Sequence, residues 1–185
     1  MSHDILFALW FFMPGGFANA TPIIAAHLPG LRNLNLPMDL GRSFRGKRIF
    51  GEHKTWRGLV AGLAIGMLIV WLQTLAFHHY GWAQSIAAPL NYGSLSFVAL
   101  GAALGVGALM GDAIESFLKR QFSIAAGHTW FPFDQLDFVI GGTLLSAVYV
   151  RLPAADYGLI LLIWFGMHLL FSYIGFLLKL KDRPL

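Results

Sequence analysis

A stretch of acidic, hydroxyl and basic residues, Gly111-Asp112-Ala-Ile-Glu115-Ser116-Phe-Leu-Lys119-Arg120, directly follows a long apolar run. At helical spacing its acids, Ser116 and Lys119 stand at i, i+3, i+4 and i+7, so they share one helix face. Carboxylates at the edge of a membrane are energetically costly, which favours a functional role. The structural alternative is a Glu115–Lys119 ion pair at a solvated helix end, and it leaves Asp112 unexplained.

A second acidic pair follows one short loop later, in Phe133-Asp134-Gln135-Leu136-Asp137-Phe138. In a helix Asp134 and Asp137 also share a face. Asp134 alone could be no more than a helix N-cap. Together with Asp112, however, the pair makes a set of three carboxylates at one membrane edge. Hard oxygen ligands of this kind suit Mg²⁺, which usually takes one or two carboxylates and substrate phosphates.

Cations are concentrated between Pro29 and Arg57. The segment holds Arg32, Arg42, Arg45, Lys47, Arg48, Lys54 and Arg57, against the two acids Asp39 and Glu52. Its glycines and prolines argue against one long helix. A basic loop beside a bilayer is also typical of the cytoplasmic side of a membrane protein. Between Gly46 and Gly58, however, glycines alternate with cations, a pattern that can bind phosphate oxygens. The run is not a Walker A loop, because Glu52 follows the second glycine.

The elements that must position these residues are membrane spans. The 185 residues are 57% hydrophobic and 12% charged, and their mean hydropathy is +0.64. We therefore predict an all-α, polytopic membrane protein with a single domain, residues 1–185, and five transmembrane helices. The apolar stretches cover residues 5–28, 59–77, 94–110, 136–150 and 157–178.

The first apolar stretch is interrupted by Pro14-Gly15-Gly16 and carries Asn19 in its interior. Such a break is tolerated in a membrane where the backbone is buried in protein or lines a wet cavity. Asn19 could instead have a structural role and make a hydrogen bond to a neighbouring helix. Since the stretch lacks a basic leader and a cleavage site, we expect it to be retained. The absence of cysteine excludes disulfides, thiolate metal sites and a cysteine nucleophile.

The orientation follows from the distribution of charge. Five spans put the two termini on opposite sides, and 12 of the 13 Lys and Arg residues then fall on one side, with Arg151 alone on the other. The positive-inside rule makes the basic side cytoplasmic and places the N-terminus outside and the C-terminus in the cytoplasm. The cytoplasmic loops are then residues 29–57 and 119–135, on the same side as both acidic pairs.

Cations and carboxylates at a cytoplasmic membrane edge favour chemistry between a nucleotide and a lipid phosphate. Such a transfer depends on positioning and charge neutralisation and needs no protein nucleophile. The sequence agrees with this, since it has neither a cysteine nor a G-x-S-x-G motif.

Five motifs in this order carry a family resemblance that covers most of the chain. They are Asn19-Ala-Thr-Pro22, Asp39-Leu-Gly41, the run from Phe44 to Gly58, the run from Gly111 to Arg120, and the run from Asp134 to Gly141. In these motifs the sequence resembles the CDP-archaeol synthases, relatives of the phosphatidate cytidylyltransferases. The phosphatidate branch typically has Asp-Arg-x-Asp where this chain has Gln135, which favours the archaeol branch.

The resemblance implies a reaction in the cytoplasmic membrane. The phosphate oxygen of an archaeal-type ether-lipid glycerol phosphate attacks the α-phosphorus of CTP, and a CDP-lipid and pyrophosphate result. It also implies the following roles: Asp112, Asp134 and Asp137 as Mg²⁺ ligands, Lys119 and Arg120 as phosphate clamps, and Asn19, Arg48, Lys54, Thr55, Arg57 and Ser116 as substrate-binding residues. The expected partners are CTP, the lipid phosphate and membrane lipids, without nucleic acid, and the small-residue helix faces permit a homodimer.

Three alternatives stay open on the sequence. The apolar spans do not distinguish an ether lipid from an acyl lipid, so phosphatidate is a competing substrate. A small transporter or scaffold would place its acids in mid-membrane, whereas here they stand at the edge. A CDP-alcohol phosphotransferase needs an Asp-Gly-x-x-Ala-Arg run, which the sequence lacks.

Overall fold

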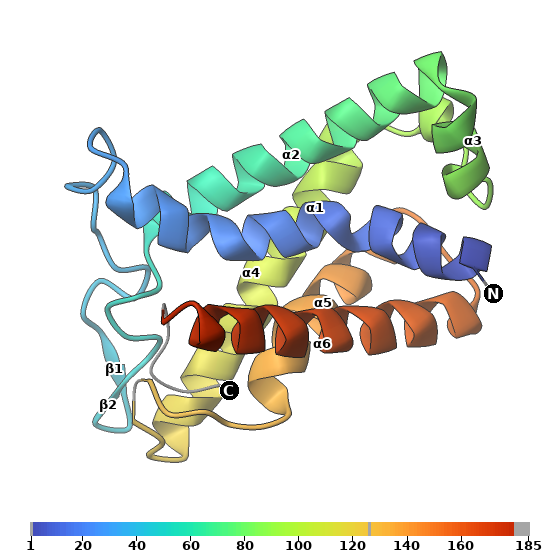
Figure 1. The fold of residues 1–185 in the computed structure, drawn as a ribbon. Helices are drawn as coiled ribbons and strands as arrows, with labels where there is room; N and C mark the ends of the chain where they lie inside the picture. Colours follow the sequence, from blue (N-terminus) through green and yellow to red (C-terminus); the bar gives the residue numbers. More distant parts are fainter. Residues whose placement is uncertain (1, 126, 180–185) are drawn as a thin grey trace.

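Residues 2–125 and 127–179 are described by the computed structural model, and their fold is helical (Figure 1). The elements in chain order are α1 (Ser2–His27), β1 (Ser43–Phe44), β2 (Lys47–Arg48), α2 (Trp56–His79), α3 (Gly81–Ala87), the 3-10 turn η1 (Tyr92–Ser94), α4 (Phe97–Gln121), α5 (Phe133–Ser146) and α6 (Ala154–Leu177). The two strands form a two-residue antiparallel hairpin. The predicted all-α class is confirmed, apart from this hairpin.

Four helices, α1, α2, α4 and α6, are long and apolar enough to cross a membrane. They coincide with four of the five predicted spans and make the chain a multi-pass membrane protein. The helix at the fifth predicted span, α5, has 14 residues, or about 21 Å at 1.5 Å per residue. Lys181 and Arg183 of the expected cytoplasmic tail lie outside the described residues.

The first helix is continuous, contrary to the predicted break at Pro14-Gly15-Gly16. Proline has no N–H to donate to the carbonyl four residues earlier, which here is that of Trp10. Gln73 of α2 fills this role, since its Nε2 donates to the Trp10 oxygen at 2.6 Å. The neighbouring glycine Gly16 leaves room for the indole of Trp164 in α6, which a Cβ would strike. A side chain of one helix therefore completes the backbone of another.

Helices α4 and α5 are in backbone contact at a glycine seam. A Cβ at Gly107 would lie 2.6 Å from the carbonyl oxygen of Gly141, and one at Gly111 would collide with that of Asp137. Small residues permit such close approach between membrane helices. The seam carries the acidic residues, because Asp112 follows Gly111 directly and Asp137 lies on the other side of the contact.

The polar part of the molecule lies at one end of the bundle. The end of α1, the start of α2, the hairpin and the loop after α4 gather there, while the N-terminus and α3 lie at the opposite end (Figure 1). The backbone outside helices at the polar end comprises residues 28–55 and 122–132. It therefore covers the ends of the helices that carry both acidic pairs.

Candidate active site

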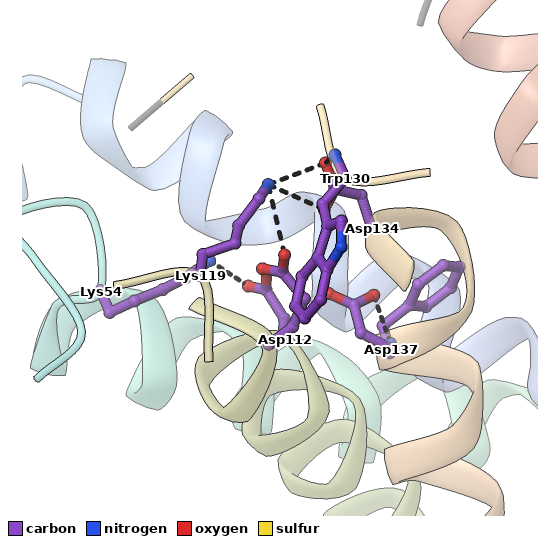
Figure 2. A network of polar contacts seen from close by, with 8 residues as sticks. Lys54, Asp112, Lys119, Trp130, Asp134 and Asp137 are labelled. Carbon is purple, nitrogen blue, oxygen red and sulfur yellow. Dashed lines mark hydrogen bonds and ion pairs between the residues drawn. The ribbon is translucent and has the colours of Figure 1, made fainter. Parts of the chain in front are cut away.

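Three carboxylates come together across the α4–α5 seam. Asp112, Glu115 and Asp137 each offer one oxygen, and these oxygens lie within 4.8 Å of one another. Asp112 and Glu115 share a face because α4 continues through the whole polar stretch to Gln121, as the helical spacing predicts. Figure 2 shows the side chains of Asp112 and Asp137 converging from the two helices. We refer to these three residues as the carboxylate cluster.

The structure places Asp134 beside Lys119, one turn of α5 nearer the loop than Asp137. The Lys119 Nζ lies 2.7 Å from Oδ1 of Asp134 and 3.2 Å from Oε1 of Glu115. The backbone N–H of Trp130 also donates to Asp134, at 3.0 Å. Of the predicted metal ligands, Asp112 and Asp137 are thus brought together, and Glu115 occupies the third position in the cluster. The Glu115–Lys119 ion pair, which the sequence offered as a purely structural explanation of these residues, is also formed.

The basic loop reaches the cluster through Lys54. Its Nζ donates to Oδ2 of Asp112 in a partly buried ion pair (Figure 2). The residues are 58 positions apart in the chain, so this pair ties the loop between α1 and α2 to the centre of α4. If this ion pair opens, the Lys54 ammonium is able to bind a phosphate oxygen and the Asp112 carboxylate a cation.

Asp39 organises the loop from its interior. Its buried carboxylate accepts hydrogen bonds from the backbone N–H groups of Gly41, Phe50 and Gly51, each at 3.0 Å, and from the guanidinium of Arg48, at 2.8 Å and 3.3 Å. Burial raises the pKa of the Asp39 carboxyl, but the hydrogen bonds from Arg48 and the three N–H groups outweigh it and hold the pKa well below its usual range. Arg48 is thereby fixed toward the site.

The hairpin is fastened to the end of α4. Lys47 donates at 2.7 Å both to the carbonyl oxygen of Gln121 and to the hydroxyl of Ser123. The Gln121 carbonyl belongs to the last turn of α4, where backbone acceptors lack helical partners and a cation is favourable. The ring of Phe44 packs against Phe117, with centroids 6.0 Å apart. The hairpin is therefore held against the end of α4 by two hydrogen bonds and a ring contact.

Two cavities open at this end of the molecule. The acid cavity, of about 960 Å³, contains the carboxylate cluster together with Arg48, Ser116, Lys119, Arg120 and Asp134. The side cavity, of about 610 Å³, lies where α1, α2, α4 and the basic loop meet, and its lining includes Asn19, Arg32, Thr55, Arg57 and apolar side chains. Both cavities are lined by Glu52, His53, Lys54 and Asp112. Every predicted site residue therefore lines one cavity or both.

Some of these residues also have structural partners. Thr55 is the N-cap of α2, and its hydroxyl accepts from the N–H of Gly58 at 3.2 Å. Arg57 donates to the carbonyl oxygens of Leu31 and Arg32, both at 3.0 Å. These hydrogen bonds fix the backbone at Leu31, Arg32 and Gly58. Thr55 and Arg57 therefore shape the wall of the side cavity.

The sequence prediction left out residues that the structure brings to the site or to the loop beside it, among them Glu115, Asp39 and His168. Glu115 was assigned to an ion pair, although it shares its helix face with Asp112. Asp39 could have been found as one of only two acids in a strongly basic loop. His168 of α6 lines the acid cavity, and an ionisable residue inside an apolar span is by itself a signal of function.

Taken together, the acid cavity combines hard oxygen ligands with four cationic side chains. Carboxylates at this spacing can hold a divalent cation, and Arg and Lys side chains bind phosphate oxygens. The described residues thus suit a phosphate compound carrying several negative charges.

Comparison with known proteins gives the same family throughout. The family model described as CarS-like, CDP-archaeol synthase, matches residues 1–185. The chain is 32% identical to the CDP-archaeol synthase of Pyrococcus furiosus, over 98% of this chain and 99% of that protein. The synthase of Thermococcus gammatolerans is 36% identical, with 98% and 96% covered. A solved structure described as an intramembrane enzyme for archaeal membrane lipids biosynthesis superposes with a TM-score of 0.70 at 29% identity, covering 88% of this chain and 90% of that one.

Proposed function

The chain belongs to the CDP-archaeol synthase family, and from this membership we propose that it transfers CMP from CTP to an archaeal-type ether-lipid glycerol phosphate. An oxygen of the lipid phosphate forms a bond to the α-phosphorus of CTP. The bond from that phosphorus to the bridging oxygen breaks, and pyrophosphate leaves with the electron pair. The chain is accordingly a CTP-dependent cytidylyltransferase of membrane lipid biosynthesis.

The observation that carries this proposal is the meeting of opposite charges in the acid cavity. The carboxylate cluster lies beside Lys54, which is held by Asp112, and Lys119, which is held by Asp134 and Glu115 (Figure 2). Cations bound to acids in advance cost little reorganisation when a polyphosphate enters. In-line transfer between two phosphates then requires only that both be held and their charge neutralised.

We propose Mg²⁺ as the cation of this site. The donor set fits, because three carboxylate oxygens within 4.8 Å of one another can face a single ion. Asp112, Glu115 and Asp137 would hold it, and Asp134 would serve as the partner of Lys119. When bound, Mg²⁺ supplies neutralisation of the charge on the phosphate oxygens.

The proposed topology has five crossings, with the N-terminus outside and the active site on the cytoplasmic face of the cell membrane. It is supported by the charge distribution, with 12 of 13 Lys and Arg residues on one side. It also treats α5 as a short crossing packed along α4. A homodimer receives no support from the glycine faces, because Gly66 of α2 packs against Gly101 and Gly105 of α4 inside the bundle.

The test is turnover of radiolabelled CTP by the purified chain, offered either the ether-lipid phosphate or phosphatidate. We expect CDP-lipid from the ether substrate and loss of turnover in Asp112→Asn and Asp137→Asn, with folding checked by circular dichroism. Product from phosphatidate alone would assign the sister activity. Full activity of either variant would refute the proposed metal ligands.

A further inference from the structure

Two tight turns of the basic loop carry unusual residues at their tips. In the first turn Leu40 and Gly41 have φ of 49° and 78°. In the second, Arg45 and Gly46 have φ of 51° and 76°. Two consecutive residues with positive φ are typical of a type I′ turn, whose first central position ordinarily takes Asn, Asp or Gly. A leucine or an arginine is sterically disfavoured there, and backbone strain of this kind is a reason to look for a function.

The side chains around these tips are exposed and are either apolar or cationic. Leu40 is 56% exposed and Phe44 is 47% exposed, and Arg42 and Arg45 are exposed as well. The Arg45 guanidinium lies over the Phe44 ring, 5.3 Å from its centroid. Among the described residues, neither arginine side chain makes a hydrogen bond or an ion pair. We refer to these four residues, Leu40, Arg42, Phe44 and Arg45, as the loop patch.

The loop patch adjoins the lipid-facing surface of α4. Ile114, Leu118 and the C-cap residue Phe122 follow one another at intervals of four, so they form one row on the helix. They are 55%, 39% and 66% exposed, and on a helix long enough to cross a membrane such a row lies against lipid. Phe117, next to Leu118, packs against Phe44 with the ring centroids 6.0 Å apart. The apolar surface of the span therefore continues onto the hairpin.

The contact with α4 also sets the depth of the patch. The hairpin lies beside the end of α4 (Figure 1), where Lys47 donates to the carbonyl oxygen of Gln121. The end of a membrane span is the level of the lipid headgroups. Long cationic side chains reach headgroup phosphates at this level, while apolar side chains enter the boundary of the acyl chains. The loop patch offers both kinds of side chain.

We propose that the loop patch binds the anionic headgroups of the membrane that the chain spans, with its two apolar side chains at the acyl boundary and its two arginines on lipid phosphates. Charge complementarity favours this partner, because the segment between Pro29 and Arg57 holds seven Lys or Arg residues against two acids, and an anionic surface attracts nearby cations. No residue of the patch lines either cavity, so the patch is a surface separate from the proposed active site. It nevertheless bears on that site, since β1 pairs with β2 and β2 carries Arg48 into the acid cavity.

The test reports what surrounds one side chain of the patch. The chain contains no cysteine, so Leu40→Cys can be labelled alone with an environment-sensitive fluorophore. The full chain is reconstituted in vesicles of equal parts phosphatidylcholine and phosphatidylglycerol, and a trace of one lipid or the other carries a nitroxide quencher near its headgroup. The matched control is Glu52→Cys, at an exposed position of the same loop that lines both cavities. Arg42→Gln and Arg45→Gln, combined in the Leu40→Cys chain, test the cations, and thermal unfolding is checked for every variant.

We expect both lipid quenchers to reach the Leu40 label but not the Glu52 label. Quenching by phosphatidylglycerol should exceed that by phosphatidylcholine by about fivefold for each arginine that lies near a headgroup. With both arginines replaced, the two lipids should quench equally.

A Leu40 label that iodide in the water quenches and neither lipid reaches would overturn the proposal, and would leave the patch open to an acidic soluble partner. Equal quenching by the two lipids while both arginines are present would overturn it too, because the patch would then have no preference for anionic headgroups. The fluorescence readout needs no turnover, so its outcome is separate from that of the proposed reaction.

Discussion

Substitution of Gly111 by alanine tests whether the α4–α5 seam holds the carboxylate cluster together. The added methyl group would collide with the carbonyl oxygen of Asp137. Neither partner can yield by rotating a side chain, because the obstacle is the backbone of α5. The two helices must therefore separate at the point where Asp112 and Asp137 face each other.

The magnitude follows from two opposing effects on stability. Overpacking a tight contact costs about 1–3 kcal/mol, and alanine is preferred to glycine in a helix by about 1 kcal/mol. The net loss of stability is then only about 0–2 kcal/mol. Activity should suffer more, because a misplacement of about 1 Å at reacting groups can cost about 100-fold in rate.

The assay compares three glycine variants under the same conditions. Gly107→Ala overpacks the same seam one turn away from the acids, with its Cβ 2.6 Å from the Gly141 oxygen. Gly166→Ala in α6 meets nothing within 4 Å and serves as the neutral control. Thermal unfolding and CMP transfer are measured for each, together with the Mg²⁺ concentration needed for half-maximal rate.

We expect Gly111→Ala to remain folded, to require more Mg²⁺ and to lose about 100-fold in rate. Gly107→Ala should lose similar stability and less activity, and Gly166→Ala should match wild type. A Gly111→Ala enzyme with wild-type rate and Mg²⁺ requirement would refute the reasoning, since the acids would then be positioned independently of the seam.

Two further predictions concern acids outside the seam. Asp134→Asn, which removes only a partner of Lys119, should raise the Mg²⁺ requirement by about tenfold at most, whereas Glu115→Gln removes a proposed ligand and should raise it further; the reverse order in a metal titration would restore Asp134 as the ligand. Because the folded-state pKa of Asp39 lies below its usual value of 3.8, its carboxylate stabilises the loop above about pH 4, and this stability is lost as the pH falls further. Asp39→Asn should therefore expose residues 37–51 to proteolysis already at pH 7, unlike Glu52→Gln, and protection equal to wild type would contradict the assigned role.

The helices and the location of the site could be predicted from the sequence, because both depend on local patterns. Apolar length predicts a span, and the i, i+3, i+4 and i+7 spacing put Asp112 and Glu115 on one face of α4 before any packing was known. The resemblance added the roles assigned to the acids of α5 and to the cations of the basic loop, which spacing and composition had already marked. Each of these inferences uses residues near one another in the chain.

The partners across the seam could not be predicted in the same way. Which of two acids on α5 meets Asp112 depends on how α5 is placed along α4, and backbone contacts such as Gly111 to Asp137 fix that placement. The break predicted at Pro14 failed for a related reason. The missing donor is supplied by Gln73, 59 residues further along the chain, and no local rule anticipates it.

The contact between Gln73 and Trp10 has a consequence for how the protein is made. Within hydrocarbon an unsatisfied carbonyl costs several kcal/mol. Helix α1 emerges before α2 during synthesis and carries that cost until α2 lies beside it and Gln73 can donate to the Trp10 oxygen. The buried Nε2 of Gln73 gains its acceptor in the same event. The first two helices are thus most stable in the bilayer as a hairpin, and their pairing is the natural first step in assembly.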